Sequence, residues 1–145
     1  MAQRDIRTQS HCFYDCKYHI VFTPKYRGKI FTSKYLKEEI RRILRIICKW
    51  KWIEILEWHV STDHIHLLLI IPPKYSVSYI MQILKWKSSA WIKKKNKSLK
   101  LKCRAWSFWS RWYFVSTVWI DDVIIRRYVK HQEAHHQVDL QWTLF

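Results

Sequence analysis

Two histidines separated by one aliphatic residue, His64-Ile65-His66, are the residues of this chain best suited to metal chemistry. Five aliphatic residues follow them, and this composition predicts a buried β-strand. Because side chains alternate along a strand, both imidazoles are expected on one face. A buried polar ring is costly unless a partner satisfies it. A shared divalent cation is one such partner, and hydrogen bonds to neighbouring groups are the alternative.

Tyr128 and Gln132 form a second candidate pair near the end of the chain. They lie four residues apart in a helix that we expect over 121–137, so they share one helix face. Asp121 and Asp122 suit its start, where acidic side chains favour the positive end of the helix dipole. Such a pair alone is typical of packing, and it becomes specific only together with the histidine strand.

The elements that must position these residues alternate between strand and helix patterns. The expected order, strand–helix–strand–strand–helix–strand and then an extra helix, indicates an α+β fold. We expect one domain over 1–145 with a ferredoxin-like (RRM-like) βαββαβ antiparallel sheet and a C-terminal helix at 121–137 that carries the tyrosine. The expected strands are Tyr14–Thr23, Trp52–His59, His64–Ile71 and Trp112–Val118; the expected helices run from Ser33 to Lys49 and from Ser76 or Ser78 to Ile92, before a lysine-rich loop at Lys93–Lys102.

The charge balance indicates a polyanionic partner. The 27 Lys and Arg residues outnumber 11 Asp and Glu residues, which gives a net charge of +16. Nucleic acid is the leading candidate, and an acidic membrane surface is a weaker one. The chain has no apolar run long enough to cross a membrane, and because its first residues lack an apolar core we expect no signal peptide. We therefore expect a cytoplasmic protein, in which the four cysteines are free thiols.

Four motifs in a fixed order carry a resemblance to a known family. They are Lys-Tyr-His-Ile-Val-Phe-Thr-Pro-Lys-Tyr-Arg at 17–27, Asp-His-Ile-His at 63–66, Tyr-Phe-Val-Ser-Thr-Val at 113–118, and Tyr-Val-x-x-Gln at 128–132. In these features the chain resembles the single-tyrosine HUH transposases of the insertion-sequence 200/605 family (TnpA-type, IS200-like), which act on single-stranded DNA. The resemblance covers nearly the whole chain.

The resemblance implies a role for each candidate residue. His64, His66 and Gln132 would bind Mg²⁺ or Mn²⁺, which would activate the scissile phosphate. Tyr128 would be the catalytic nucleophile and form a covalent 5′-phosphotyrosine. The implied partner is single-stranded DNA with hairpin ends. The protein would be a homodimer that can exchange its C-terminal helix about Val118–Asp122, so Tyr128 could act in cis or in trans.

The glycine content departs from the family pattern. The chain has one glycine and ten tryptophans, and family members commonly have glycine where this chain has tryptophan. We expect a tryptophan at such a position to overpack the core by roughly 1–3 kcal/mol. The positions concerned are Trp52, Trp58, Trp86, Trp112 and Trp119.

Three other functions stay open at this stage. The chain could be a non-catalytic module that binds single-stranded nucleic acid on its sheet. It could be an inactive, decayed transposase. It could also be a host-domesticated relative that acts on repeated palindromes.

Overall fold

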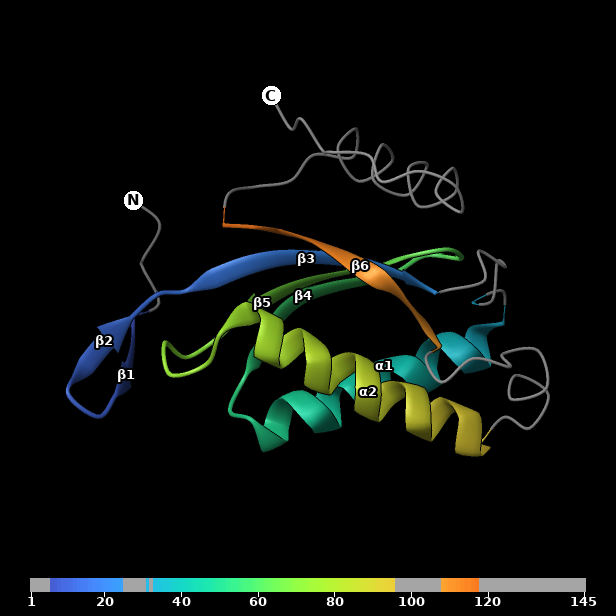
Figure 1. The fold of residues 1–145 in the computed structure, drawn as a ribbon, viewed down its shortest axis with the longest axis horizontal. Helices are drawn as coiled ribbons and strands as arrows, with labels where there is room; N and C mark the ends of the chain where they lie inside the picture. Colours follow the sequence, from blue (N-terminus) through green and yellow to red (C-terminus); the bar gives the residue numbers. More distant parts are fainter. Residues whose placement is uncertain (1–5, 25–30, 32, 96–107, 118–145) are drawn as a thin grey trace, which may run out of the picture.

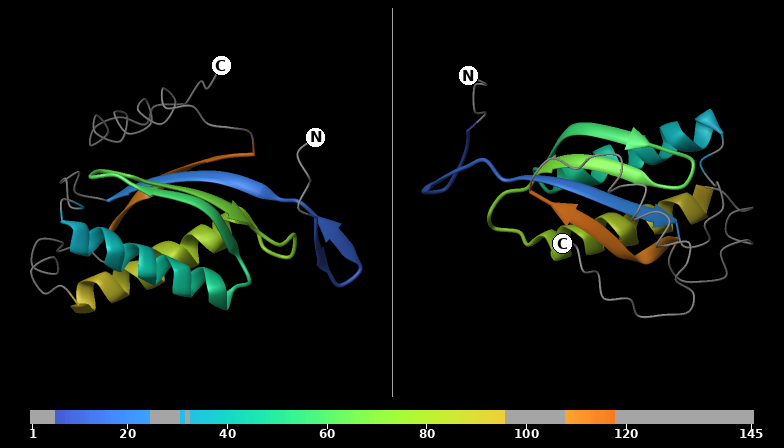
Figure 2. Two further views of the ribbon diagram at one scale, coloured as in Figure 1. Left: turned by 180° about the vertical axis from the view of Figure 1, so that it is seen from behind. Right: turned by 90° about the horizontal axis from the view of Figure 1, so that it is seen from above.

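The computed structural model describes residues 6–24, 31, 33–95 and 108–117. Four of the strands in these ranges form one sheet in the order β4-β5-β3-β6, and all neighbouring strands are antiparallel. Two helices lie side by side against one face of this sheet (Figures 1 and 2). The prediction of an α+β protein with an antiparallel sheet is confirmed. The elements are β3 (Lys17–Pro24), α1 (Lys34–Trp50), β4 (Glu54–Val60), β5 (Ile65–Ile70), α2 (Val77–Lys95) and β6 (Trp109–Ser116).

Serine side chains cap both helices, as the sequence predicts. The Leu36 backbone N–H donates to Oγ of Ser33 at 3.1 Å, and the Tyr79 N–H donates to Oγ of Ser76 at 3.1 Å. The second helix continues to Lys95, so the predicted loop at Lys93–Lys102 is wrong in its first three residues. Lysines in a last helical turn face the negative end of the helix dipole, which favours this extension. No helix in the described ranges is both long and apolar enough to cross a membrane.

The core lies between the helices and the face of the sheet that they cover. Its centre is aliphatic, and the start of β6 adds buried Trp109 together with Phe108, the residue before it. Two buried serines of α2 hold this segment: the indole Nε1–H of Trp109 donates to Ser88 Oγ, and the Phe108 N–H donates to Ser89 Oγ, both at 2.7 Å. The main aliphatic contributors are Ile20, Ile40, Ile43, Leu44, Ile47, Ile65, Leu67, Leu69, Ile80 and Leu84.

A short hairpin that the sequence analysis did not predict precedes the sheet. It consists of β1 (Arg7–Gln9) and β2 (Cys12–Tyr14), and it projects from one end of the molecule (Figure 1). His11 in its turn adopts φ 59°, a conformation that usually requires glycine. Because residues 12–14 pair within this hairpin, the first strand of the main sheet begins at Lys17 and not at Tyr14. Similarly, β6 begins at Trp109, three residues before the predicted strand.

Trp52 occupies the position after α1 that favours glycine most strongly. Its φ is 58°, while the N–H of Trp52 donates to the Lys49 carbonyl and the N–H of Ile53 donates to the Cys48 carbonyl. These two hydrogen bonds and the left-handed residue form a Schellman motif, in which glycine normally supplies the positive φ. Trp52 is therefore unfavourable because of its backbone conformation.

The expectation that the tryptophans overpack the core is wrong for three of the four described positions. Trp52, Trp86 and Trp112 are 80%, 70% and 60% exposed. Trp58 is half-buried, and the Arg45 guanidinium covers its ring at 4.6 Å from the ring centre. Trp52, Trp86 and Trp112 are accommodated because they point outward, whereas Trp58 packs against the core. Trp119 lies outside the described residues.

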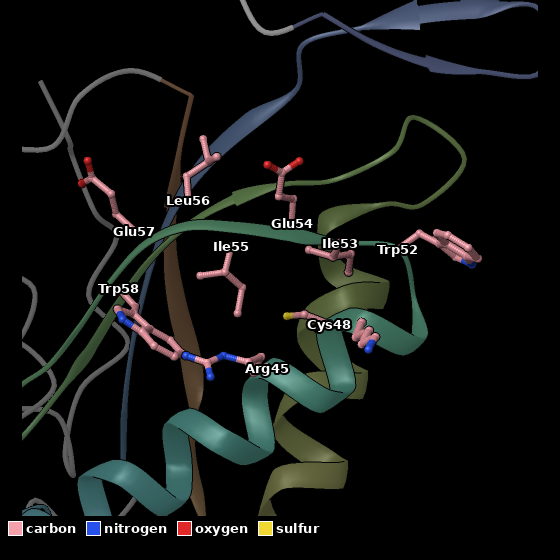
Figure 3. A pocket seen from close by; sticks show the side chains of 10 residues that line it. Arg45, Cys48, Trp52, Ile53, Glu54, Ile55, Leu56, Glu57 and Trp58 are labelled. Carbon is pink, nitrogen blue, oxygen red and sulfur yellow. The ribbon is translucent and has the colours of Figure 1, made fainter.

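Trp58 and Arg45 also close one end of a cavity between α1 and the edge strand β4. The cavity has a volume of about 450 Å³, and Trp52 is among the residues that line it (Figure 3). It is lined by basic and acidic side chains, including Arg45, Lys49 and Glu54. Because these charges are mixed, the cavity is not a specific anion site.

Candidate active site

His66 lies in the middle of the sheet, on the face that the two helices leave open. It belongs to β5 and is paired with His59 on β4 and with Val21 on β3. The neighbouring residues Ile65 and Leu67 point to the other face and are fully buried in the core. The alternation predicted for this strand is therefore present, and it separates the imidazole from the aliphatic core.

A β-bulge in β4 places a second histidine next to His66. The register of β4 against β5 shifts between Ile55 and Glu57, so Leu56 is an extra residue in β4. Ile55 packs against the core, and without the bulge His59 would face the same way, since the two residues are four apart. With the bulge, Trp58 and Val60 face the core and His59 stands beside His66 on the open face.

His64 lies one residue before β5, in the turn that joins it to β4. The N–H of Ser61 donates to the His64 carbonyl at 2.9 Å and closes this turn. The ring centres of His64 and His59 are 6.4 Å apart. Nδ1 of His64 lies 2.8 Å from the Asp63 carboxylate, so in the neutral ring Nδ1–H donates and the Nε2 lone pair remains available. This is the arrangement that proteins use to orient a metal-binding histidine.

The fourth histidine of the cluster, His19, comes from β3. Its Nδ1 lies 3.4 Å from Nε2 of His66, so one ring donates to the other. Burial lowers the pKa of His66, and the nearby His19, His64 and His59 rings lower it further, while Glu57 opposes them. Burial also lowers the pKa of His19, again against the effect of Glu57. Both rings are therefore neutral at pH 7, and the ring that accepts this hydrogen bond uses its lone pair in it.

The motifs of the sequence predict only part of this cluster. His64 and His66 share the open face as predicted, but His19 and His59 were not singled out. The alternating strand pattern around His19 was a signal for its face, whereas the position of His59 depends on the bulge. Tyr128, Gln132 and the expected helix over 121–137 lie outside the described residues. Within the described ranges, no group of three or more His, Cys, Asp or Glu side chains is arranged to hold a metal ion. A cation held by His64 and His66 would thus need a further ligand from elsewhere.

These features define an α+β domain with a two-helix layer on one side of its sheet and clustered imidazoles on the other. The family model described as "Transposase IS200 like" matches residues 12–132, a span that includes Tyr128 and Gln132. The chain therefore belongs to the IS200-like transposase family, and the family resemblance seen in its motifs is confirmed.

Individual relatives agree with this assignment. The chain is 45% identical over 140 residues to the transposase for insertion sequence element IS200 of Salmonella typhimurium, and the match covers 97% of this chain and 91% of the relative. It is 28% identical over 105 residues to the ISDra2 transposase TnpA of Deinococcus radiodurans, covering 72% of this chain and 74% of that protein. A crystal structure of a candidate transposase from Deinococcus radiodurans R1 has the same fold, with a TM-score of 0.76 at 22% identity, covering 87% of this chain and 97% of that one.

Proposed function

We propose that the protein is a DNA transposase that cleaves and rejoins single-stranded DNA at hairpin-marked element ends. Family membership and the near full-length match to an IS200 transposase support this function. The net charge of +16 suits a polyanionic substrate. The observation that carries the proposal is the pair His64 and His66 on the open face of the sheet, with His64 already oriented by Asp63.

The chemistry of these donors fits a divalent cation. His64, His66 and Gln132 would hold Mg²⁺ or Mn²⁺, and such a cation supplies Lewis-acid activation of the scissile phosphate when it is bound. The chain's own part is to present neutral imidazoles. Asp63 accepts the Nδ1 proton of His64, and burial keeps His66 deprotonated at pH 7.

Tyr128 is the proposed nucleophile. Its Oη forms a bond to the phosphorus while the bond from phosphorus to the 3′ oxygen breaks. The tyrosine hydroxyl gives up its proton, the leaving oxygen gains one, and the products are a 5′-phosphotyrosine and a free 3′-hydroxyl. Attack of a 3′-hydroxyl on this linkage reverses the step and joins strands, so rejoining needs no nucleotide cofactor.

The proposal also includes the overall architecture of the active protein. We propose that the order of β3, α1, β4, β5, α2 and β6 represents a ferredoxin-like core, to which residues 121–137 add the helix that carries Tyr128. Two copies would form a homodimer, and exchange of this helix would bring Tyr128 of one copy to the histidines of the other. If the exchange occurs, mixing Tyr128→Phe protein with a His64→Ala, His66→Ala variant should restore cleavage. Without exchange, the mixture should stay inactive.

The direct test is the formation of a covalent protein–DNA adduct. The substrate is a pool of hairpin oligonucleotides with randomised single-stranded flanks, labelled at the 3′ end because the tyrosine would retain the 3′ fragment. We expect an adduct that resists denaturation in Mn²⁺ or Mg²⁺ and is lost in EDTA, in Tyr128→Phe and in His66→Ala. His11→Asn, at an exposed histidine in the β1–β2 turn, is the matched control and should keep full activity. Binding without any adduct, in folded protein, would favour a non-catalytic binding module or an inactive transposase.

A further inference from the structure

A groove rich in tryptophan and lysine runs between α1 and α2 on the side of the helices that faces away from the sheet. It has a volume of about 870 Å³. Its walls come from the end of α1 and the first three turns of α2, and none of its lining residues is acidic. We call it the Trp–Lys groove, and it is lined by Ile47, Trp50, Lys51, Tyr79, Gln82, Ile83, Trp86 and Lys87.

Aromatic rings and ammonium groups lie close together in this groove. Nζ of Lys87 lies 5.1 Å from the ring centre of Trp50 and 5.8 Å from that of Trp86, so one positive charge is close to two indoles. Nζ of Lys51 lies 5.5 Å from the ring centre of Tyr79 and donates to its hydroxyl oxygen at 3.2 Å. Each ammonium is thus held close to a ring and cannot move far from the groove.

The three rings present free surface, and neighbouring rings also fix the orientation of Trp50 and Tyr79. Trp86 is 70% exposed, Trp50 52% and Tyr79 40%. Trp50 packs edge-on against Trp91 at 5.4 Å between ring centres, and Tyr79 is stacked on Tyr75 at 5.5 Å. A ring that is held from one side and open on the other binds a planar partner at a low entropic cost.

The charge and shape of the groove favour single-stranded nucleic acid as its ligand. Planar rings interleaved with positive charges match a chain that alternates planar bases with phosphates, and this combination is typical of surfaces that bind single-stranded nucleic acid. A second copy of the chain packed groove to groove would bring the same lysines together, so self-association at this groove is opposed electrostatically. An acidic membrane would satisfy the lysines, but the groove is concave and a membrane surface is flat.

We propose that the Trp–Lys groove is a second binding site for single-stranded DNA, in which unpaired bases stack on Trp50 and Trp86 and a phosphate contacts Lys87. The inference rests on single-stranded DNA being the substrate of the proposed transposase. The helices that line the groove cover one face of the sheet (Figure 1), and the histidine cluster lies on the other face. The groove therefore holds a stretch of strand away from the site of cleavage, without reading its sequence.

Binding of fluorescein-labelled oligo-dT, measured by anisotropy, tests this site apart from catalysis. The protein is the full chain carrying Tyr128→Phe, and the buffer contains EDTA, so neither cleavage nor a metal contributes. Trp86→Ala should weaken binding roughly tenfold or more. Lys87→Gln should reduce the slope of log affinity against log salt by about 0.7, as expected for one lost phosphate contact. Phe13→Ala removes a ring that is 79% exposed outside the groove and should change neither quantity.

Each of the remaining outcomes would overturn the proposal. The first is oligo-dT binding that is unchanged in a Trp50→Ala, Trp86→Ala double variant. The second is selective loss of binding to phosphatidylserine vesicles in that variant, which would assign the groove to a membrane. The third is a change of its oligomeric state alone in sedimentation, which would assign the groove to self-association.

A positive adduct assay with unchanged oligo-dT binding would reject the groove and leave the transposase function standing. Weakened oligo-dT binding in the groove variants, together with no adduct in the active protein, would reject the transposase function and leave the groove standing.

Discussion

Nδ1 of His64 and the carboxylate of Asp63 lie 2.8 Å apart in the turn between β4 and β5. The two residues are adjacent in sequence, so a single tight turn supplies both the imidazole and the group that orients it. The carboxylate fixes the tautomer that leaves Nε2 available, which is the form of the ring needed to bind a cation.

Replacing Asp63 should therefore weaken the active site without removing a metal ligand. We expect Asp63→Asn to raise the Mn²⁺ concentration needed for half-maximal adduct formation by about 10-fold to 100-fold, because an amide orients the imidazole less strongly. Asp15→Asn is the control, since Asp15 is an exposed carboxylate that contacts Lys17 at 3.2 Å outside the cluster. An unchanged metal dependence in Asp63→Asn would show that Asp63 does not orient His64 for a cation.

Two tryptophan-to-glycine substitutions should have opposite effects on stability. Trp52→Gly should raise the free energy of unfolding by about 1 kcal/mol, because glycine adopts φ 58° without strain and the exposed ring has little packing to lose. Trp86→Gly should lower it by about 1 kcal/mol, because glycine is unfavourable inside a helix such as α2. Urea denaturation measures both values. Stabilisation by both substitutions would instead support overpacking.

Glu39 should make stability fall in acid. It contacts Arg42 at 2.8 Å and Lys95 at 2.9 Å and so joins α1 to the end of α2. Hydrogen bonds, first from Arg42 and then from Lys95, lower the pKa of Glu39 from 4.5 to about 2. A carboxylate with a lowered pKa stabilises the fold above pH 4.5, and this contribution is lost as the pH falls through 2.

The matching experiment compares the original protein with Glu39→Gln across this range. The variant should be less stable by up to about 1 kcal/mol at pH 7, since the basic partners are half exposed to solvent. The difference should vanish near pH 2. A difference that stays constant from pH 7 to pH 2 would contradict the ionic role of Glu39.

Lys85 should change the stability of the fold at alkaline pH. Its Nζ donates to the carbonyls of Ser110, Arg111 and Trp112 at 2.9, 3.3 and 3.0 Å, which ties α2 to β6. Burial lowers the pKa of Lys85 from 10.5 to about 8. Between these two pH values the unfolded chain binds more protons than the folded protein, so this group makes stability rise with pH.

Lys85→Met isolates this contribution. The variant should be less stable by about 1 kcal/mol near pH 8, because the three carbonyls lose their donor. The deficit should grow between pH 8 and 10.5. Thermal denaturation at a series of pH values provides the comparison, and parallel curves for Lys85→Met and the original protein would contradict the pKa assignment.

Local patterns were sufficient to predict most of the fold. The Ser33 cap, the amphipathic helix that follows it and the hairpin around Asp63 all depend on neighbours in sequence, and all are present. The β1–β2 hairpin was missed because its turn uses His11 at positive φ, where a glycine would have marked it. Because His11 and not glycine occupies this position, the usual sequence signal for a turn is missing.

The histidine cluster was only half predictable for a different reason. The spacing of His64 and His66 fixes their common face, but the inclusion of His59 depends on the extra residue Leu56 in β4. A one-residue shift of register reverses every side chain after it, and nothing local in the sequence indicates where the shift occurs. Likewise, Trp52 is exposed because it follows the end of α1, and Trp86 is exposed because it lies on the solvent-facing side of α2. Residue type alone would not predict this exposure.

Peptide mapping of the adduct tests most directly whether Tyr128 is the residue linked covalently to the DNA during strand transfer. The adduct formed in Mn²⁺ is digested with nuclease and protease, and the modified peptide is identified by mass spectrometry. We expect a nucleotide linked through its 5′ phosphate to Tyr128 and to no other tyrosine. A nucleotide on a different side chain, or an adduct that still forms in Tyr128→Phe, would contradict this role of Tyr128.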